Sequence, residues 1–125
     1  MSGHGIRDDK AARNSYVDAL RFACDQVGPV GIDILIEPIN GRDMPGYFMN
    51  DFNFAADLIA ELGLPNLKLQ FDIYHRQIIH GDVLTGLKSL FPLIAHVQIA
   101  SVPARNEPGT GELDDFRVLK ELDAL

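Results

Sequence analysis

Apolar side chains along this chain alternate between a helical spacing and short continuous runs. Residues 10–27 repeat apolar positions at the spacing of an amphipathic helix, and Gly28-Pro29 is expected to end it. The β-branched run at 32–36 predicts a buried strand, and the turn-forming residues at 40–46 predict a loop.

The same alternation continues to the C-terminus. Further strands are predicted at 67–72 and 93–99, and further helices are expected to start at Asn50 or Asp51, at Asp82 and near Asp114. The first of these helices is expected to end at Gly63, with an inward face made of Phe54, Leu58, Ile59 and Leu62. The last helix is expected to keep its apolar residues on one side, namely Phe116, Leu119 and Leu122.

The predicted order is therefore four helices alternating with three strands, an α/β fold. Strands separated by helices of this length pair in parallel through right-handed crossovers. Two architectures remain open from the pattern alone, a small doubly wound sheet and part of a (β/α)₈ barrel.

Composition and charge narrow the function classes. The chain has 125 residues, of which 46% are hydrophobic, so it is long enough to bury the core of one globular domain. Its net charge of −7 argues against a nucleic-acid partner and against an anionic membrane surface, both of which require a basic footprint. An anionic substrate stays open, because a bound cation can supply local positive charge.

The cellular compartment is suggested by what the sequence lacks. Cys24 is the only cysteine, so an internal disulfide is excluded, and no apolar run is long enough to cross a membrane. Residues 1–5 show neither the charged nor the apolar part of a signal peptide. A cytoplasmic location is the expectation.

Each predicted strand carries a polar residue at or near its C-terminal end. These residues are Glu37, Asp72 and Gln98. The carboxyl ends of parallel strands meet at one edge, where such folds bind ligands, so the three side chains are expected to converge. Two carboxylates and an amide oxygen favour Mg²⁺ or Mn²⁺. For any one of them, the alternative is an N-cap or a solvated loop residue.

Two further residues are candidates for substrate contact. His75 follows Asp72 closely and could hydrogen-bond a substrate oxygen, although its position alone is that of a surface loop histidine. Arg105 is in the predicted loop 101–113 and could bind a carboxylate through two hydrogen bonds.

Four stretches of this sequence together resemble the hydroxypyruvate isomerase family of xylose isomerase-like TIM barrels. They are Leu35-Ile-Glu-Pro-Ile-Asn40, Leu69-Gln-Phe-Asp-Ile-Tyr-His75, His96-Val-Gln-Ile-Ala100 and Pro103-Ala-Arg-Asn-Glu-Pro-Gly-Thr-Gly-Glu112. The resemblance implies an isomerase that interconverts hydroxypyruvate and tartronate semialdehyde through a metal-stabilised enediolate. Its relatives include 2-oxo-tetronate isomerases and, more distantly, sugar epimerases, which are alternative activities.

The resemblance also implies roles for single residues. Glu37, Asp72 and Gln98 match the metal ligands of the family, and Glu37 also matches one of its two proton-transfer glutamates. His75 and Arg105 match its substrate-binding histidine and arginine. The expected partner is a small 2-oxo or 2-hydroxy acid.

A complete barrel of this kind needs about 250 residues and eight strands. Residues 1–125 are therefore expected to form a single partial barrel domain with family strands five to seven, without the N-terminal half and the last strand. The fourth ligand, a glutamate, is expected just beyond Leu125. Such a fragment is expected to be inactive alone, and its two open sheet edges would also permit a homo-oligomer. The alternative of another class is a non-enzymatic α/β interaction module that binds no metal.

Overall fold

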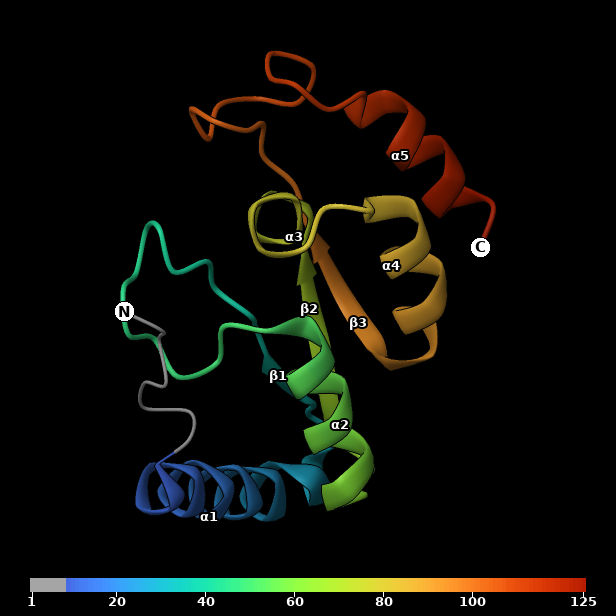
Figure 1. The fold of residues 1–125 in the computed structure, drawn as a ribbon. Helices are drawn as coiled ribbons and strands as arrows, with labels where there is room; N and C mark the ends of the chain where they lie inside the picture. Colours follow the sequence, from blue (N-terminus) through green and yellow to red (C-terminus); the bar gives the residue numbers. More distant parts are fainter. Residues whose placement is uncertain (1–8) are drawn as a thin grey trace.

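The computed structural model describes residues 9–125, so the N-terminal residues 1–5 discussed above fall outside it (Figure 1). The helices are α1 (Lys10–Val27), α2 (Phe52–Leu62), α3 (Ile73–Ile79), α4 (Val83–Leu90) and α5 (Asp115–Asp123). The strands are β1 (Ile34–Ile36), β2 (Leu67–Asp72) and β3 (Ile94–Gln98), and short 3₁₀ turns are η2 (Gly28–Val30) and η3 (Phe91–Leu93). Over residues 9–125, no helix is both long and apolar enough to span a membrane.

The three strands form one parallel sheet in the order β1-β2-β3, as predicted. The central strand β2 pairs Leu69 with Ile36 of β1 and Asp72 with Gln98 of β3. In Figure 1 all three strands point towards α3, and the long loop between β3 and α5 runs on the same side of the molecule. The carboxyl ends of the strands therefore meet at one edge, below α3.

The two faces of β2 differ in polarity. Leu67, Leu69 and Phe71 are buried in the core, against which α2 packs, whereas Lys68 and Gln70 on the opposite face are half-buried. This alternation follows from the two-residue repeat of a strand. Asp72 continues the polar face at the end of the strand, which directs its carboxylate towards the site described below.

The predicted limits of α2 are confirmed by its caps. The Asp51 carboxylate accepts a hydrogen bond from the Phe54 backbone N–H at 2.8 Å, and Gly63 ends the helix with a left-handed φ of 59°. The inward face differs from the prediction, because Phe52 and Ala55 are buried in addition to Leu58, Ile59 and Leu62. Phe52 is fully buried, whereas Phe54 is only half-buried.

Helix α3 was not predicted, and the expectation of four helices was wrong for this reason. The described residues form five, because Asp72 ends β2 and caps α3 at once: its carboxylate accepts from the Tyr74 backbone N–H at 2.8 Å. The run that follows is only seven residues long and mixes apolar with polar side chains, so its periodicity was ambiguous between strand and helix. His75 therefore lies on a buried helix and not on a surface loop.

The predicted apolar side of α5 is largely exposed. Phe116 is 67% exposed and Leu119 37%, whereas Val118 is buried at 2%. The reason is that α5 packs against α4 through the side that carries Val118. The start at Asp114 is confirmed, because its carboxylate accepts from the Arg117 N–H.

The starts of two strands shift relative to the prediction, and one predicted helix cap forms no side-chain hydrogen bond. β1 begins at Ile34 and not at Ile32, because Gly31 caps η2 with a left-handed φ of 75° and the Ile32 N–H donates back to the Val27 carbonyl. β3 begins at Ile94, after η3. Asp82 precedes α4 as predicted, but its side chain makes no capping hydrogen bond.

Candidate metal and substrate site

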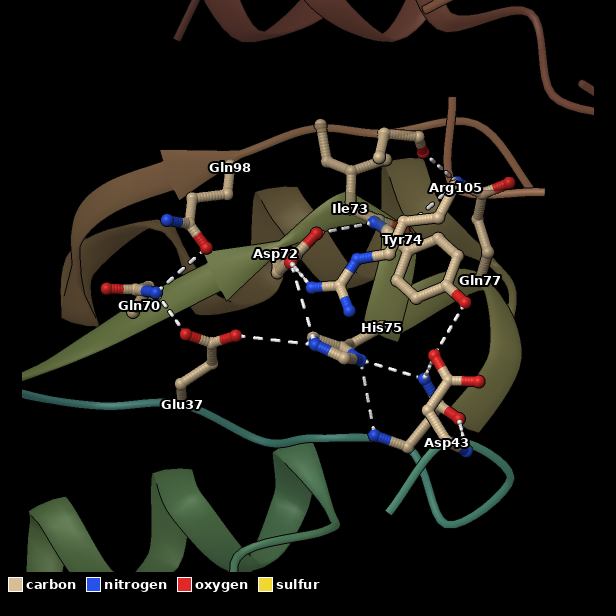
Figure 2. Close-up of polar contacts among 12 residues, drawn as sticks. Glu37, Asp43, Gln70, Asp72, Ile73, Tyr74, His75, Gln77, Gln98 and Arg105 are labelled. Carbon is tan, nitrogen blue, oxygen red and sulfur yellow. Dashed lines mark hydrogen bonds and ion pairs between the residues drawn. The ribbon is translucent and has the colours of Figure 1, made fainter. Parts of the chain in front are cut away.

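The polar residues predicted at the strand ends do lie at a common edge of the sheet (Figure 2). Glu37 follows β1 directly, and Asp72 and Gln98 are register partners at the ends of β2 and β3. Asp72 is buried at 4% exposure, Glu37 is half-buried and Gln98 is exposed. The prediction that the three side chains share one edge is therefore confirmed, while their role as metal ligands stays a prediction.

Glu37, Asp72 and His75 form the tightest polar cluster of the site. Each offers one ligand atom, and these atoms lie within 4.8 Å of one another, a spacing that could hold a metal ion. His75 Nε2 is 3.4 Å from Glu37 Oε1 and 3.7 Å from Asp72 Oδ2. Burial of these groups makes their interaction stronger than it would be in water.

Gln98 joins this cluster through Gln70, which the sequence reasoning had not singled out. The Gln70 Nε2 group donates to Gln98 Oε1 at 2.9 Å and also to Glu37 Oε2. Gln98 therefore turns its carbonyl oxygen, the atom able to bind a cation, towards Gln70 and Glu37 (Figure 2). Gln70 precedes Asp72 by two positions, and this strand spacing was the signal that could have identified it.

His75 is held from its other side by the loop after β1. It is 1% exposed, and its Nδ1 atom is 3.2 Å from the Asn40 backbone nitrogen and 2.9 Å from Asn40 Nδ2. Asp43 bonds to both ends of the Asn40 side chain, and Tyr74 Oη donates to Asp43 Oδ2 at 2.6 Å. One local signal was visible beforehand, because Asn40 and Asp43 are three residues apart in a loop rich in turn-forming residues.

Arg105 reaches the site from the loop after β3. Its Nη2 is 4.0 Å from Asp72 Oδ2, and its guanidinium carbon is 4.7 Å from the centre of the Tyr74 ring. The side chain is 53% exposed, so it is accessible to a ligand above the sheet. Its backbone is left-handed, with a φ of 59°, a conformation that is uncommon for an arginine.

The loop that carries Arg105 is folded upon itself. The Ser101 N–H donates to the Asn106 carbonyl at 2.9 Å, and the Arg105 N–H donates to the Ser101 carbonyl at 2.8 Å. At its far end, the buried Asp115 carboxylate accepts from the Gly109 N–H at 2.7 Å. These bonds fix the backbone of the loop while leaving the Arg105 side chain exposed.

A comparison with known proteins now identifies the family. The sequence profile of the xylose isomerase-like TIM barrels matches residues 1–125. The chain belongs to this family. The predicted partial barrel is thereby confirmed, and the small doubly wound sheet is set aside.

Relatives of this TIM-barrel chain include isomerases. The 2-oxo-tetronate isomerase of Cupriavidus necator is 45% identical over 118 residues, which are 94% of this chain and 45% of that protein. The hydroxypyruvate isomerase of Escherichia coli K12 is 40% identical over 112 residues, 87% of this chain and 43% of that protein. A solved structure, described as an AP endonuclease of family 2 from Brucella melitensis, superposes with a TM-score of 0.89 at 39% identity, covering 92% of this chain and 45% of that one. The chain thus spans less than half the length of these relatives.

The surroundings of the carboxyl edge of this partial barrel shift the pKa values of Glu37 and His75. Burial raises the pKa of Glu37, and the nearby negative charge of Asp72 raises it further, while Arg105 opposes the shift. Burial lowers the pKa of His75, against the opposing effect of Asp72. The site therefore combines a carboxyl group of increased proton affinity with a histidine that favours its neutral form.

Proposed function

We propose that this chain contributes the part of an active site that contains Glu37. The enzyme would be an isomerase that interconverts hydroxypyruvate and tartronate semialdehyde. The observation that supports this proposal most strongly is the cluster of Glu37, Asp72 and His75 at the carboxyl edge of the sheet, with Arg105 above it. The isomerases among its relatives support the same reaction class. Since the chain spans 45% and 43% of these two proteins, the activity of the whole protein is part of the proposal.

The donor set fits a hard divalent cation, and we propose Mg²⁺ or Mn²⁺. Glu37, Asp72 and the carbonyl oxygen of Gln98 would hold it, an all-oxygen set that includes two anionic groups. When bound, such an ion would polarise the substrate carbonyl and stabilise the enediolate as its charge develops.

Glu37 is proposed to move the proton. Its carboxylate would remove a proton from the carbon beside the carbonyl and return it to the neighbouring carbon. The raised pKa of Glu37 supports the first step, because it makes the carboxylate a stronger base. His75 and Arg105 would hold the substrate oxygens, with the Arg105 guanidinium placed to bind a carboxylate.

The identity of the substrate is the finer part of the proposal. A 2-oxo-tetronate or a sugar would use the same proton transfer, and the loops after the strands would set the size of the ligand. The net charge of −7 favours a small molecule over DNA as the partner, and we propose a cytoplasmic enzyme. A homo-oligomer fits the described sheet, whose outer strands β1 and β3 each pair on one side.

The test is a chimera in which residues 1–125 replace the matching segment of the Escherichia coli hydroxypyruvate isomerase. We expect this chimera to turn over hydroxypyruvate, and Glu37→Gln to lower kcat by about 100-fold or more, the usual contribution of general acid–base catalysis. The matched control is Asp57→Asn, which makes the same charge change at an exposed position on α2. Unchanged turnover in the Glu37→Gln chimera would remove Glu37 from the chemistry.

The isolated chain should behave differently from the chimera. We expect little or no isomerase activity from the 125 residues alone, because the two isomerase relatives are more than twice as long as the segments that match this chain. Turnover by the purified chain at a rate typical of enzymes would contradict this expectation.

A further inference from the structure

We propose that Asn40 is a positioning residue that fixes His75 as the neutral tautomer with its proton on Nε2. The catalytic meaning of this proposal rests on the function proposed above. Its structural content, the position of the proton on the His75 ring, does not depend on that function. Asn40 is 0% exposed and contacts His75 through both its backbone and its side chain.

The orientation of the Asn40 amide is set by Asp43. The Asp43 backbone N–H can only donate, and it is 2.9 Å from Asn40 Oδ1. The Asp43 carboxylate can only accept, and its Oδ2 is 3.2 Å from Asn40 Nδ2. A flipped amide would oppose donor to donor and acceptor to acceptor, so the Asn40 NH₂ group must be the one that faces His75.

The protonation of His75 Nδ1 then follows. Two N–H groups point at this atom, the Asn40 backbone N–H from 3.2 Å and the Asn40 Nδ2 group from 2.9 Å. A protonated Nδ1 would have no acceptor on this side and would oppose both donors. Nδ1 is therefore an acceptor, and the single proton of the neutral ring is on Nε2.

The Nε2–H group in turn faces the candidate ligands. It lies 3.4 Å from Glu37 Oε1 and 3.7 Å from Asp72 Oδ2, on the opposite edge of the ring from Asn40 (Figure 2). A nitrogen that carries a proton has no free lone pair for a metal ion. Within the cluster, His75 thus serves as a hydrogen-bond donor to a carboxylate or a substrate oxygen, and the cation ligands are oxygens.

A second pair of contacts keeps this arrangement in place. Tyr74 Oη donates to Asp43 Oδ2 at 2.6 Å, and the Arg105 guanidinium stacks on the Tyr74 ring. The loop after β1, helix α3 and the loop after β3 are therefore connected through Asp43, Tyr74 and Arg105. Because His75 is adjacent to Tyr74 on α3, the same contacts that place Arg105 also restrict the histidine ring.

The tautomer can be read directly from the ¹⁵N resonances of histidine side chains in the labelled chain at neutral pH. For His75 we expect Nδ1 to show the resonance of an unprotonated acceptor nitrogen and Nε2 that of a protonated one. His80 provides an internal reference of opposite sense, because its Nε2 accepts from the Phe52 N–H at 3.3 Å. A protonated Nδ1 in wild-type His75 would overturn the proposal, and this result does not depend on any variant.

Two matched variants separate the Asn40 side chain from the rest of the network. Asn40→Asp places an acceptor against Nδ1, so we expect a proton to appear on that atom and its acceptor-type resonance to be lost. Asp43→Asn changes the neighbouring charge but keeps the backbone N–H that orients Asn40, so the His75 tautomer should stay as in wild type. An unchanged Nδ1 resonance in Asn40→Asp would show that the side chain does not fix the tautomer. If Asn40→Asp does not fold, Asn40→Ala serves instead, and we expect the Nδ1-protonated form to become detectable.

Results that contradict the proposed function can be distinguished from results that contradict the role of Asn40. Titration of the wild-type chain with Mg²⁺ should leave the proton on His75 Nε2, as expected for a ring that is not a ligand. A chain with the Nε2–H tautomer but neither Mg²⁺ binding nor activity in the chimera would contradict the isomerase proposal and leave the role of Asn40 intact. Loss of the Nε2 proton on Mg²⁺ addition would contradict the inference made here.

Discussion

The environment of β2 and that of β3 differ sharply although the two strands are neighbours in one sheet. Leu69 and Phe71 of β2 are 0% exposed, because β2 pairs on both sides and packs against α2. Three of the five residues of β3 are exposed, and Phe116 on the helix that follows is 67% exposed. In the described residues, β3 pairs with β2 alone.

The residues of the candidate site differ in burial in the same way. Asp72, His75 and Asn40 come from β2, α3 and the loop after β1, and all three are buried. Gln98 and Arg105 come from β3 and its loop, and both are exposed. Asp72 and His75 are therefore held by the core, whereas Gln98 and Arg105 form an exposed, ligand-facing rim.

Removing a large side chain from each region should give the largest difference. We expect Phe71→Ala to lower the free energy of unfolding by about 3–5 kcal/mol, because it removes a fully buried ring from the core. Phe116→Ala should cost no more than about 0.5–1 kcal/mol, because its ring is mostly exposed. Urea unfolding of both variants measures the two values.

This first prediction would be contradicted by similar losses in the two variants. Such a result would mean that Phe116 is covered in solution, for example by a second copy of the chain. Repeating the unfolding at several protein concentrations separates that explanation from an error in the described core, because association makes stability depend on concentration.

Metal binding should also distinguish the buried residues of the site from the exposed ones, with an effect on stability of intermediate size. A cation at about 100 times its dissociation constant raises the unfolding free energy by about 2.7 kcal/mol. We expect Mg²⁺ or Mn²⁺ to raise the melting temperature of the wild-type chain, and Asp72→Asn to abolish this increase. Asparagine can still accept the Tyr74 N–H, so the variant removes the anionic ligand while keeping the cap of α3. Gln98→Ala should only reduce the increase, because it removes a neutral and exposed ligand.

The control for the metal experiment is again Asp57→Asn on α2, which should respond to the cation as wild type does. An equal response in the wild-type and Asp72→Asn chains would show that the stabilisation does not come from this cluster. A wild-type chain without any response would favour the alternative of a non-enzymatic α/β module.

Some elements of the fold were predicted accurately from the sequence, and others were missed. The helix over residues 10–27 and the strand over 67–72 were predicted with their observed limits, because a long periodic stretch and a strand bounded by turn residues are strong local signals. α3 was missed, since its start depends on a tertiary arrangement in which Asp72 both ends β2 and caps a helix. The side of α5 that is buried depends on α4, which no local pattern encodes.

The candidate site was predictable to a similar extent. Glu37, Asp72 and Gln98 were found because parallel strands align their ends. His75 and Arg105 were candidates from their positions and were favoured by the family resemblance, and the structure places both near Asp72. Asn40 was missed, because its contact with His75 joins a loop and a helix that are distant in sequence, and only the three-dimensional structure shows which ring nitrogen it faces.

The smallest effect is expected at Arg105, on the exposed rim. Arg105→Gly loses the stacking on Tyr74, worth about 0.5–1 kcal/mol at an exposed site, and gains a residue that adopts a φ of 59° without strain. We therefore expect its unfolding free energy to stay within about 1 kcal/mol of wild type. Arg105→Ala loses the same stacking but keeps the left-handed backbone, so it should be less stable than Arg105→Gly by about 1 kcal/mol.

Equal stability of the Arg105→Gly and Arg105→Ala chains would contradict the left-handed conformation at this position. In the chimera described above, both variants should weaken substrate binding and raise KM, because both remove the guanidinium. A residue whose loss affects binding strongly and stability little is what the exposed rim predicts, whereas Phe71 should show the opposite. Arg105 would then be retained for its ligand and not for the fold, at the cost of an unfavourable backbone conformation.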